Sequence, residues 1–376
     1  MRTRRTGTQS AQRSVSVPHG RLRSEVSGGA FRACRTVKIA LIAPPWLPVP
    51  PPAYGGTEAV IDRLARGFSA AGADVLLITT GDSTCPVERD WVYPRAQTER
   101  MGNGLVELRH LIHAYDAAAD ADIVHDHTIF GPLYAGRAGR ERVVTTNHGP
   151  FDDELTDIYR ALGHRVPIIC ISRSQAATAV GLPIAKVIHH GVDPDAFRVG
   201  TGQGGYYLFL GRMTANKGPR EAALAALKAG VRLLIAGKMR EADEREYFAA
   251  EVQPLLVDGV EYVGEVAYDE KVELLGGAVA LLNPIAWDEP FGLVMVESLA
   301  CGTPVLAFPR GAAPEIVEHG ITGFLCRDVD DMVLRLADAR QLSRFRCRAA
   351  VEKHFSTDRM VREHLDLFEE LLTRWV

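Results

Sequence analysis

Apolar residues along this chain gather in short runs, and longer segments with a helical spacing of apolar positions separate the runs. The first set of runs predicts buried β-strands at residues 37–43, 74–80, 122–125, 142–146 and 166–171. Helical spacing is clearest at 57–71 and 105–118, where apolar residues recur every three or four positions. Strands that alternate with helices in this way are typical of a parallel sheet with helices on both faces.

A second alternation of the same kind follows a polar, glycine-rich break at residues 200–205, which is typical of a linker. Beyond this break, apolar runs predict strands at 206–211, 231–236, 260–263, 279–284 and 304–307. The predicted fold class is therefore α/β, with two doubly wound, Rossmann-like domains in series. We expect an N-terminal domain over 37–199, a linker over 200–205, a second domain over 206–355 and an amphipathic terminal helix over 356–376.

Charge is distributed unevenly along the 376 residues. Residues 1–36 carry eight arginines and one acidic residue, whereas the whole chain has a net charge of −4, so the remainder carries about −11. An acidic body argues against a protein whose affinity rests on neutralising nucleic-acid phosphates. The basic segment has no apolar run long enough for a signal peptide or a membrane span, so we expect a disordered leader. The six cysteines are scattered without metal-type spacing, which is typical of a reduced, cytoplasmic protein.

Two carboxylates flank a segment that is apolar on nearly every side. Glu289 comes directly before Pro290-Phe291-Gly292, and Glu297 lies within the predicted buried helix that follows. A buried carboxylate costs roughly several kcal/mol unless something hydrogen-bonds it, and the hydroxyls of a ligand are good candidates. Glu289 lies just before a helix N-terminus, where backbone N–H groups attract anions. Acceptors for hydroxyls beside donors for phosphate indicate a nucleotide-sugar site.

Two cations, Arg212 and Lys217, occupy a loop between a predicted strand and a predicted helix that begins at Pro219. In open α/β sheets, ligands bind beyond the carboxyl ends of the strands, and this loop lies at such an end. Arginine clamps phosphate with two hydrogen bonds and lysine adds a point charge, so the pair could neutralise a diphosphate. Two solvated loop charges are the alternative interpretation, which the flanking Gly211 and Gly218 make less attractive.

The loop after the first predicted strand ends in Gly55-Gly56, with Thr57 as the predicted N-cap of the next helix. Two residues without side chains would allow the backbone to approach a phosphate, although an ordinary tight turn is at least as well supported. The loop matches neither the dinucleotide-binding G-x-G-x-x-G pattern nor the P-loop pattern, and neither occurs elsewhere in the chain.

Histidines end two predicted strands of the first domain. His127 and His148 both lie at carboxyl ends, so we expect them at the same edge of the sheet as the Gly55-Gly56 loop. A metal site made by His125, Asp126 and His127 is disfavoured, because successive strand positions point to opposite faces. The second His-His pair, at 189–190, is interpreted as structural. Glu315 is interpreted equally well as a first-turn helix acid or as a ligand contact.

In this order, the motifs resemble those of retaining, nucleotide-sugar-dependent glycosyltransferases of family 4 with the GT-B fold. The resemblance runs from Lys38 to about Leu325. It rests on the E-x₇-E spacing of Glu289 and Glu297 together with Arg212 and Lys217. It implies two Rossmann-like domains that face a cleft and a C-terminal helix that returns to the N-terminal domain. Two positions depart from the family pattern: Ala312 stands where many members have glycine, and His190 stands where asparagine commonly precedes Gly-Val-Asp.

The resemblance also implies a role for each matching residue. Arg212 and Lys217 would bind the donor diphosphate, Glu289 would contact the hydroxyls of the transferred sugar, and Glu297 would hold the ribose. The remaining implied site residues are the backbone amides of Phe291, Gly292, Leu293 and Val294 near the sugar and phosphate, Gly56 near the phosphate, His148 beside the reaction centre, and His127 on the acceptor side. These enzymes work without a divalent metal, so the resemblance implies no metal and no cofactor, with the nucleotide sugar as co-substrate.

The expected function is therefore transfer of a hexosyl group from a nucleoside diphosphate sugar, with a UDP-sugar as the expected donor, to a hydroxyl of an acceptor, with retention of anomeric configuration. The mixed charges of residues 99–122 favour a soluble acceptor over a membrane lipid. The acceptor expected from short members of the family is a small metabolite such as a pterin or an antibiotic-type compound. The alternatives are a nucleotide-sugar epimerase of similar fold, a lipid- or polysaccharide-directed glycosyltransferase at the membrane surface, and a non-catalytic nucleotide-sugar sensor.

Overall fold

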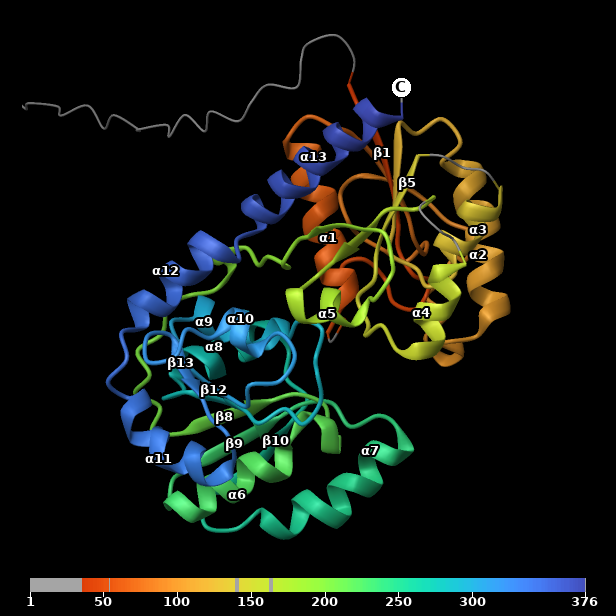
Figure 1. Ribbon diagram of the computed structural model, residues 1–376. Coiled ribbons are helices and arrows are strands. Elements are labelled where there is room, and N and C mark those ends of the chain that lie inside the picture. Colours follow the sequence, from red (N-terminus) through yellow and green to blue (C-terminus); the bar gives the residue numbers. More distant parts are fainter. Residues whose placement is uncertain (1–35, 54, 139–141, 162–164, 376) are drawn as a thin grey trace, which may run out of the picture. The chain divides into compact units, whose positions relative to one another are not determined.

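The computed structural model describes residues 36–375, except for Tyr54 and the segments 139–141 and 162–164 (Figure 1). The predicted basic leader therefore lies outside the described residues, apart from Thr36. Two parallel β-sheets, one in each half of the described chain, organise the fold and confirm the predicted α/β class.

The first sheet has seven strands in the order β3-β2-β1-β4-β5-β6-β7, and every neighbouring pair is parallel. The strands are β1 (Lys38–Ile42), β2 (Asp74–Ile78), β3 (Glu88–Asp90), β4 (Ile123–Asp126), β5 (Val143–Thr146), β6 (Ile168–Cys170) and β7 (Ile184–Val187). The helices of this half are α1 (Gly56–Ala70), α2 (Gly104–Ala117), α3 (Gly131–Ala138), α4 (Asp153–Arg160), α5 (Arg173–Thr178) and the short 3₁₀ turns η1 (Thr98–Arg100) and η2 (Pro194–Ala196).

The second sheet has six parallel strands in the order β10-β9-β8-β11-β12-β13. They are β8 (Tyr207–Leu210), β9 (Leu233–Ala236), β10 (Val260–Gly264), β11 (Leu281–Asn283), β12 (Val305–Ala307) and β13 (Gly323–Leu325). The helical elements are η3 (Ala215–Lys217), α6 (Pro219–Ala229), α7 (Ala242–Tyr247), η4 (Phe248–Val252), η5 (Gln253–Leu255), α8 (Tyr268–Gly277), α9 (Leu293–Ala300), α10 (Ala313–Ile316), α11 (Val329–Ala339) and α12 (Arg344–His354).

Both faces of each sheet are buried, as the uninterrupted apolar runs predict. On β1, Ile39 and Leu41 pack in one cluster with residues of α1, whereas Ala40 and Ile42 pack in another with residues of α2. The terminal helix α13 (Thr357–Arg374) belongs to the first of these clusters and lies along α1, so it packs against the N-terminal half as expected (Figure 1).

Three features of the fold differ from the predictions. The edge strands β3 and β7 were not predicted, because their residues, Glu-Arg-Asp and Ile-Ala-Lys-Val, form no apolar run. Residues Gly323–Leu325, for which no strand was predicted, form β13 by pairing with β12. The predicted N-cap Thr57 is also wrong, because α1 begins at Gly56 and Gly55 occupies the N-cap position.

The segment predicted as a linker is held against the second half of the chain. Backbone N–H groups of Gly200, Gly202 and Gly204 donate to the carbonyls of Cys301, Gly276 and Gly277 at 2.9–3.0 Å. The chain crosses between the two halves at Val192 and again near Ser356, and these crossings pair in a parallel β-bridge. The predicted Gly-rich break is therefore part of the second half's packing.

Five cysteines of the described chain, Cys85, Cys170, Cys301, Cys326 and Cys347, are buried and free, and burial raises the pKa of each thiol to about 12. They are the inert buried thiols that the scattered spacing indicates. Within the described residues, the helices are too short or too polar to cross a membrane.

Candidate functional site

The two predicted phosphate-binding cations lie directly after β8. Lys217 ends η3, and Gly218 connects it to α6, whose first residue is Pro219 as predicted. Gly218 adopts φ 77°, and a Cβ atom there would lie 2.2 Å from the carbonyl oxygen of Pro284. Only glycine fits this turn, and the turn places Lys217 beside the loop that follows β11.

Lys217 is paired with Glu289 through a direct Nζ–Oε1 contact, and its ammonium group lies 5.7 Å from the centre of the Trp287 ring. Both side chains of the ion pair are mostly buried, at 13% and 15% exposure. Arg212 is more open, and its Nη1 is 3.7 Å from Oε1 of the buried Glu244. Its guanidinium group makes no hydrogen bond within the described part of the chain. The structure thus brings Arg212, Lys217 and Glu289 to one edge of the second sheet.

The backbone of Glu289 is fixed by the loop between β12 and α10. The N–H of Ala312 donates to the carbonyl of Glu289 at 3.0 Å, and the N–H of Gly311 donates to Oδ1 of Asp288 at 3.1 Å. Gly311 has φ 53°, and a Cβ atom at this position would lie 2.2 Å from the Glu289 carbonyl oxygen. The position requires glycine both for its conformation and for the close approach.

Glu297 is buried on α9, and its partner is a lysine from another helix. Nζ of Lys271, on α8, lies 2.9 Å from Oε1 of Glu297 and 5.1 Å from the centre of the Tyr268 ring. The sequence argument required a partner for this carboxylate but missed Lys271. Nothing in the local pattern around residue 271 indicates a contact with residue 297, because the two meet only when α8 packs against α9.

The N-terminus of α9 presents unpaired donors at the same edge. The backbone N–H groups of Phe291, Gly292, Leu293 and Val294 have no hydrogen-bond acceptor within the described residues, which is usual for the first turn of a helix. The side chain of Phe291 itself is only 2% exposed. Leu293 reaches the first half of the chain, since its Cδ1 is 3.5 Å from the position a Cβ of Gly56 would occupy.

The two predicted site histidines lie together at the edge of the first sheet. His127 follows β4 and His148 follows β5, and Nδ1 of His127 is 2.9 Å from Nε2 of His148. The other ring nitrogen of His148, Nδ1, is 3.2 Å from Nε2 of His190, whose ring stacks on that of His148. Burial lowers the pKa of His148 to about 3, and it lowers the pKa values of His127 and His190 well below 6.5. All three rings are therefore neutral at pH 7.

His125 and Asp126 make their hydrogen bonds to protein groups. Nε2 of His125 is 2.8 Å from Oγ1 of Thr146, and the carboxylate of Asp126 accepts from the hydroxyl of Tyr115 at 2.6 Å and from Thr128. Burial raises the pKa of Asp126 to about 6. Among the residues that the structure describes, no group of histidine, cysteine, aspartate and glutamate side chains is placed to hold a metal ion.

Glu315, for which the sequence left two interpretations, contacts protein groups. Its carboxylate accepts from the backbone N–H groups of Arg173 and Ser174 at 2.9 and 2.8 Å and lies 2.8 Å from Nε2 of His189. Hydrogen bonds from His189 and these two amides lower its pKa against the opposing effect of burial. Glu315 thus joins α10 of the second half to α5 of the first.

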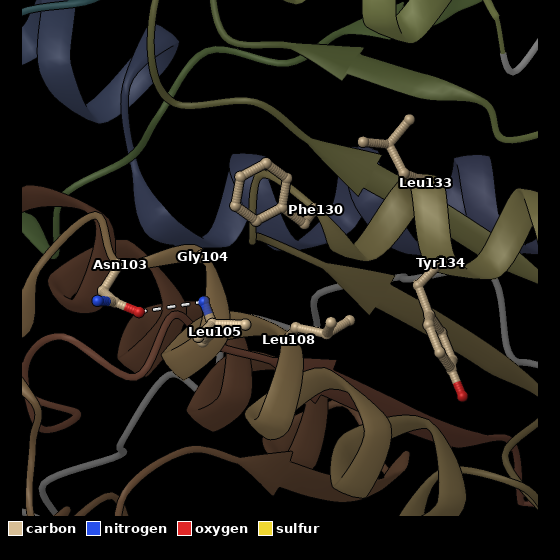
Figure 2. Close-up of a pocket in the computed structure, with 7 residues that line it drawn as sticks. All are labelled: Asn103, Gly104, Leu105, Leu108, Phe130, Leu133 and Tyr134. Atoms are coloured by element: carbon tan, nitrogen blue, oxygen red, sulfur yellow. Dashed lines mark hydrogen bonds between the residues drawn. The ribbon is translucent and has the colours of Figure 1, made fainter.

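A separate apolar groove of about 950 Å³ lies between α2 and α3 (Figure 2). Leu105 and Leu108 of α2 face Leu133 and Tyr134 of α3 across it, with Phe130 at one end. None of the predicted site residues lines this groove. Phe130 is three residues from His127, and the backbone N–H of Phe130 donates to the buried Glu107 at 2.9 Å.

Two parallel sheets joined by a double crossing, with cations, carboxylates and helix N–H groups at the strand ends, define a glycosyltransferase with the GT-B fold. The chain belongs to the family 4 glycosyltransferases. The family model for Glycosyltransferase Family 4 matches residues 54–196, and the model for Glycosyl transferases group 1 matches residues 198–343.

Among solved structures, the chain is similar to AviGT4, a glycosyltransferase involved in avilamycin A biosynthesis, with a TM-score of 0.68 and 27% identity over 90% of this chain and 98% of the other. It is 31% identical over 123 residues to N-acetyl-alpha-D-glucosaminyl L-malate synthase of Bacillus anthracis, which is 31% of this chain and 32% of the relative. It is 32% identical over 203 residues to D-inositol 3-phosphate glycosyltransferase of Mycobacterium bovis, which is 46% of this chain and 40% of the relative. The chain thus matches well under half the length of these curated relatives.

Proposed function

We propose that this protein transfers a hexosyl group from a nucleoside diphosphate sugar, with a UDP-sugar as the expected donor, to a hydroxyl of a small soluble acceptor, with retention of configuration. One observation carries the proposal. Arg212, Lys217, the free N–H groups of α9 and the two glutamates gather at one edge of the second sheet. Donors for a diphosphate and acceptors for sugar hydroxyls are the groups that a nucleotide sugar needs.

In the proposed reaction, the bond between the anomeric carbon and the diphosphate oxygen breaks, and the electron pair stays on the diphosphate. Arg212, Lys217 and the N-terminus of α9 stabilise this leaving charge, a contribution that is usually the largest in catalysis. The acceptor oxygen bonds to the anomeric carbon on the face that the diphosphate leaves, and its proton passes to the leaving phosphate. Attack on the same face gives retention.

The proposal assigns neutralisation of the leaving group to protein cations, and it includes no metal and no resident cofactor. Glu289 is proposed to accept hydroxyls of the transferred sugar and Glu297 those of the ribose. Each already has a lysine partner, Lys217 and Lys271, which supports an acceptor role for both carboxylates. His148, with His127 on its acceptor side, is proposed to lie beside the reaction centre.

The relatives support a small acceptor. The two curated relatives are named for L-malate and for D-inositol 3-phosphate, and AviGT4 is involved in the biosynthesis of avilamycin A. A cytoplasmic location is part of the proposal, and the five buried, free thiols support it.

The test is UDP release from a panel of UDP-sugars, with and without a panel of small hydroxyl acceptors, with NMR of the product. We expect acceptor-dependent release and a retained anomeric centre. Arg212→Ala should lower turnover by about 100-fold or more, because removing one transition-state donor typically costs that much. Arg232→Ala is the matched control, since Arg232 is an exposed arginine paired with Glu261 on the same sheet.

The other outcomes distinguish the alternatives. Conversion of the donor sugar without an acceptor would identify an epimerase. Tight donor binding without turnover would identify a sensor. An inverted product, or normal turnover in Arg212→Ala, would overturn the proposed mechanism.

A further inference from the structure

Three imidazole rings from three separate segments form one hydrogen-bonded row. His127 follows β4, His148 follows β5, and His190 follows β7. The nitrogen–nitrogen distances are 2.9 Å between His127 and His148 and 3.2 Å between His148 and His190. The side chains of His127 and His190 are buried, that of His148 is partly exposed, and both ring nitrogens of His148 are used.

A neutral imidazole carries one N–H donor and one lone-pair acceptor. In each contact of the row, one ring must donate through its N–H and the other must accept through its lone pair. Because a neutral ring has only one N–H, the choice of donor at one contact fixes the donor at the next. Two orders exist. Either Nδ1 carries the proton in His127, His148 and His190 alike, or Nε2 carries it in all three. A mixed row would place two donors or two lone pairs against each other.

The end of the row favours the first order. Nε2 of His127 is buried and has no hydrogen-bond partner within the described residues. If Nε2 carried the proton, a buried N–H donor would lack an acceptor, whereas the first order leaves only a lone pair there. Orphaned buried N–H groups are rarer in proteins than acceptors with unused capacity. The structure therefore favours protonation at Nδ1 along the row.

The groups around the row act against a further proton. Burial is the main cause of the lowered pKa of each of the three rings, and repulsion from neighbouring basic side chains adds to it. Those groups are His125 on β4, His364 on α13, Arg63 on α1 and His189 next to His190. The row thus stays neutral, which the single proton order requires.

The row also reaches the donor half of the site. The ring of His190 packs edge-on against that of Phe291, with centroids 5.1 Å apart, and Phe291 directly precedes Gly292 and the free N–H groups of α9. A ring held at both nitrogens cannot turn or change tautomer without breaking a bond. His148 is therefore set in one orientation before any substrate binds, and preorganisation of this kind lowers the barrier of the chemical step.

We infer that His127 and His190 are positioning residues that hold His148 as the neutral Nδ1–H tautomer beside the reaction centre. The functional part of this inference rests on the proposed glycosyl transfer, whereas the tautomer assignment does not. It goes beyond the site residues predicted from the sequence, among which His190 does not appear.

The first test is ¹⁵N NMR of the full-length protein labelled at histidine. The His148 signals are identified by their loss in His148→Gln. We expect a protonated Nδ1 and an unprotonated Nε2 for His148, and the same pattern for His127 and His190, unchanged from pH 8 to pH 6. An averaged tautomer, a protonated Nε2 on His148 or titration in this range overturns the inference. This readout needs no enzymatic activity, so it holds or fails separately from the proposed function.

The second test compares two substitutions of His190. His190→Asn keeps an acceptor, because the Asn amide oxygen can take the hydrogen bond from His148 Nδ1. His190→Leu removes the acceptor. We expect the leucine variant to lose the single tautomer of His148 and to lower kcat by about 10-fold or more with little change in donor KM, since a loss of preorganisation acts on the chemical step. The asparagine variant should keep both the tautomer and most of kcat.

His319→Leu is the matched control, because His319 is exposed and lies in the second half of the chain. Equal kcat in the leucine and asparagine variants, with His148 unchanged in both spectra, would overturn the positioning role. If no acceptor supports turnover in the wild-type protein, the proposed function fails, and the spectra alone decide the inference.

Discussion

Acid should unfold this protein near pH 5.5, because six histidines are buried without charge. They are His110, His125, His127, His148, His190 and His364; the side chain of His148 is partly exposed and the other five are buried. Burial lowers the pKa of His110 and His364 to about 4 and that of His148 to about 3, and it lowers the other three pKa values well below 6.5. In the unfolded chain, these histidines titrate near pH 6.5.

The sign follows from proton counts. Below pH 6.5 the unfolded state binds protons that the folded state does not, so the free energy of unfolding falls as pH falls. When the pH falls from 7.5 to 5.5, each such histidine lowers the free energy of unfolding by about 1.4 kcal/mol, and the six together lower it by about 8 kcal/mol. Glu58, Asp126 and Glu107 act in the opposite direction, because burial raises their pKa values, those of Glu58 and Asp126 to about 7 and about 6; these two together return about 2.5 kcal/mol. The net loss is about 5 kcal/mol, comparable with the whole stability of many domains.

Urea unfolding followed by circular dichroism at pH 7.5 and 5.5, at constant ionic strength, measures this loss directly. His364→Leu should reduce the loss by about 1.4 kcal/mol, since it removes one of the six groups. A free energy of unfolding that agrees within about 1 kcal/mol at the two pH values would refute the reasoning, because the expected net loss is about 5 kcal/mol.

Three further predictions concern the donor site. Lys217→Met should lower turnover by about 100-fold, since it removes a phosphate cation and leaves Glu289 unpaired, whereas Lys228→Met, at an exposed ion pair, should not. Lys271→Met leaves the buried Glu297 without its partner, so it should lower the free energy of unfolding by about 2 kcal/mol and weaken UDP binding measured by calorimetry. Wild-type values for both quantities would contradict the role of this pair. Gly311→Ala should raise the donor KM by displacing Glu289, whereas Gly320→Ala, with a similar positive φ but open space, should only cost about 1 kcal/mol of stability.

Most of the strands that the sequence predicts correctly have an apolar run that is buried on both faces; the half-exposed edge strand β10 is an exception. β1 and β2 are examples, and the central position of β1 follows from its burial between two clusters. The edge strand β3 has no such run, since its Glu-Arg-Asp residues gain their structure only by pairing with β2. Single-sequence patterns record burial, and edge strands that are half exposed carry little of that signal.

The residues of the candidate site also fall into two groups, those that the sequence identified and those that it missed. Arg212, Lys217 and Glu289 were found because each lies after a strand or before a helix, and Glu297 because it is the single acid of an apolar helix; a local pattern can locate both kinds of position. Lys271 and His190 were missed as partners, because each contact joins residues that are far apart along the chain: 26 positions for Lys271 and Glu297, and 42 for His148 and His190. Neither spacing has a periodicity that predicts contact.

The pairing of the two glutamates decides between two roles for them. Two carboxylates that divide acid and base functions by sharing a proton must lie against each other, because like charges at short range raise one of the pKa values. Glu289 instead lies against Lys217 on the loop after β8, and Glu297 lies against Lys271 on α8. Each lysine contacts one carboxylate oxygen and leaves the other as an acceptor for hydroxyl groups. The arrangement therefore supports the proposal of two separate binding contacts with a nucleotide sugar.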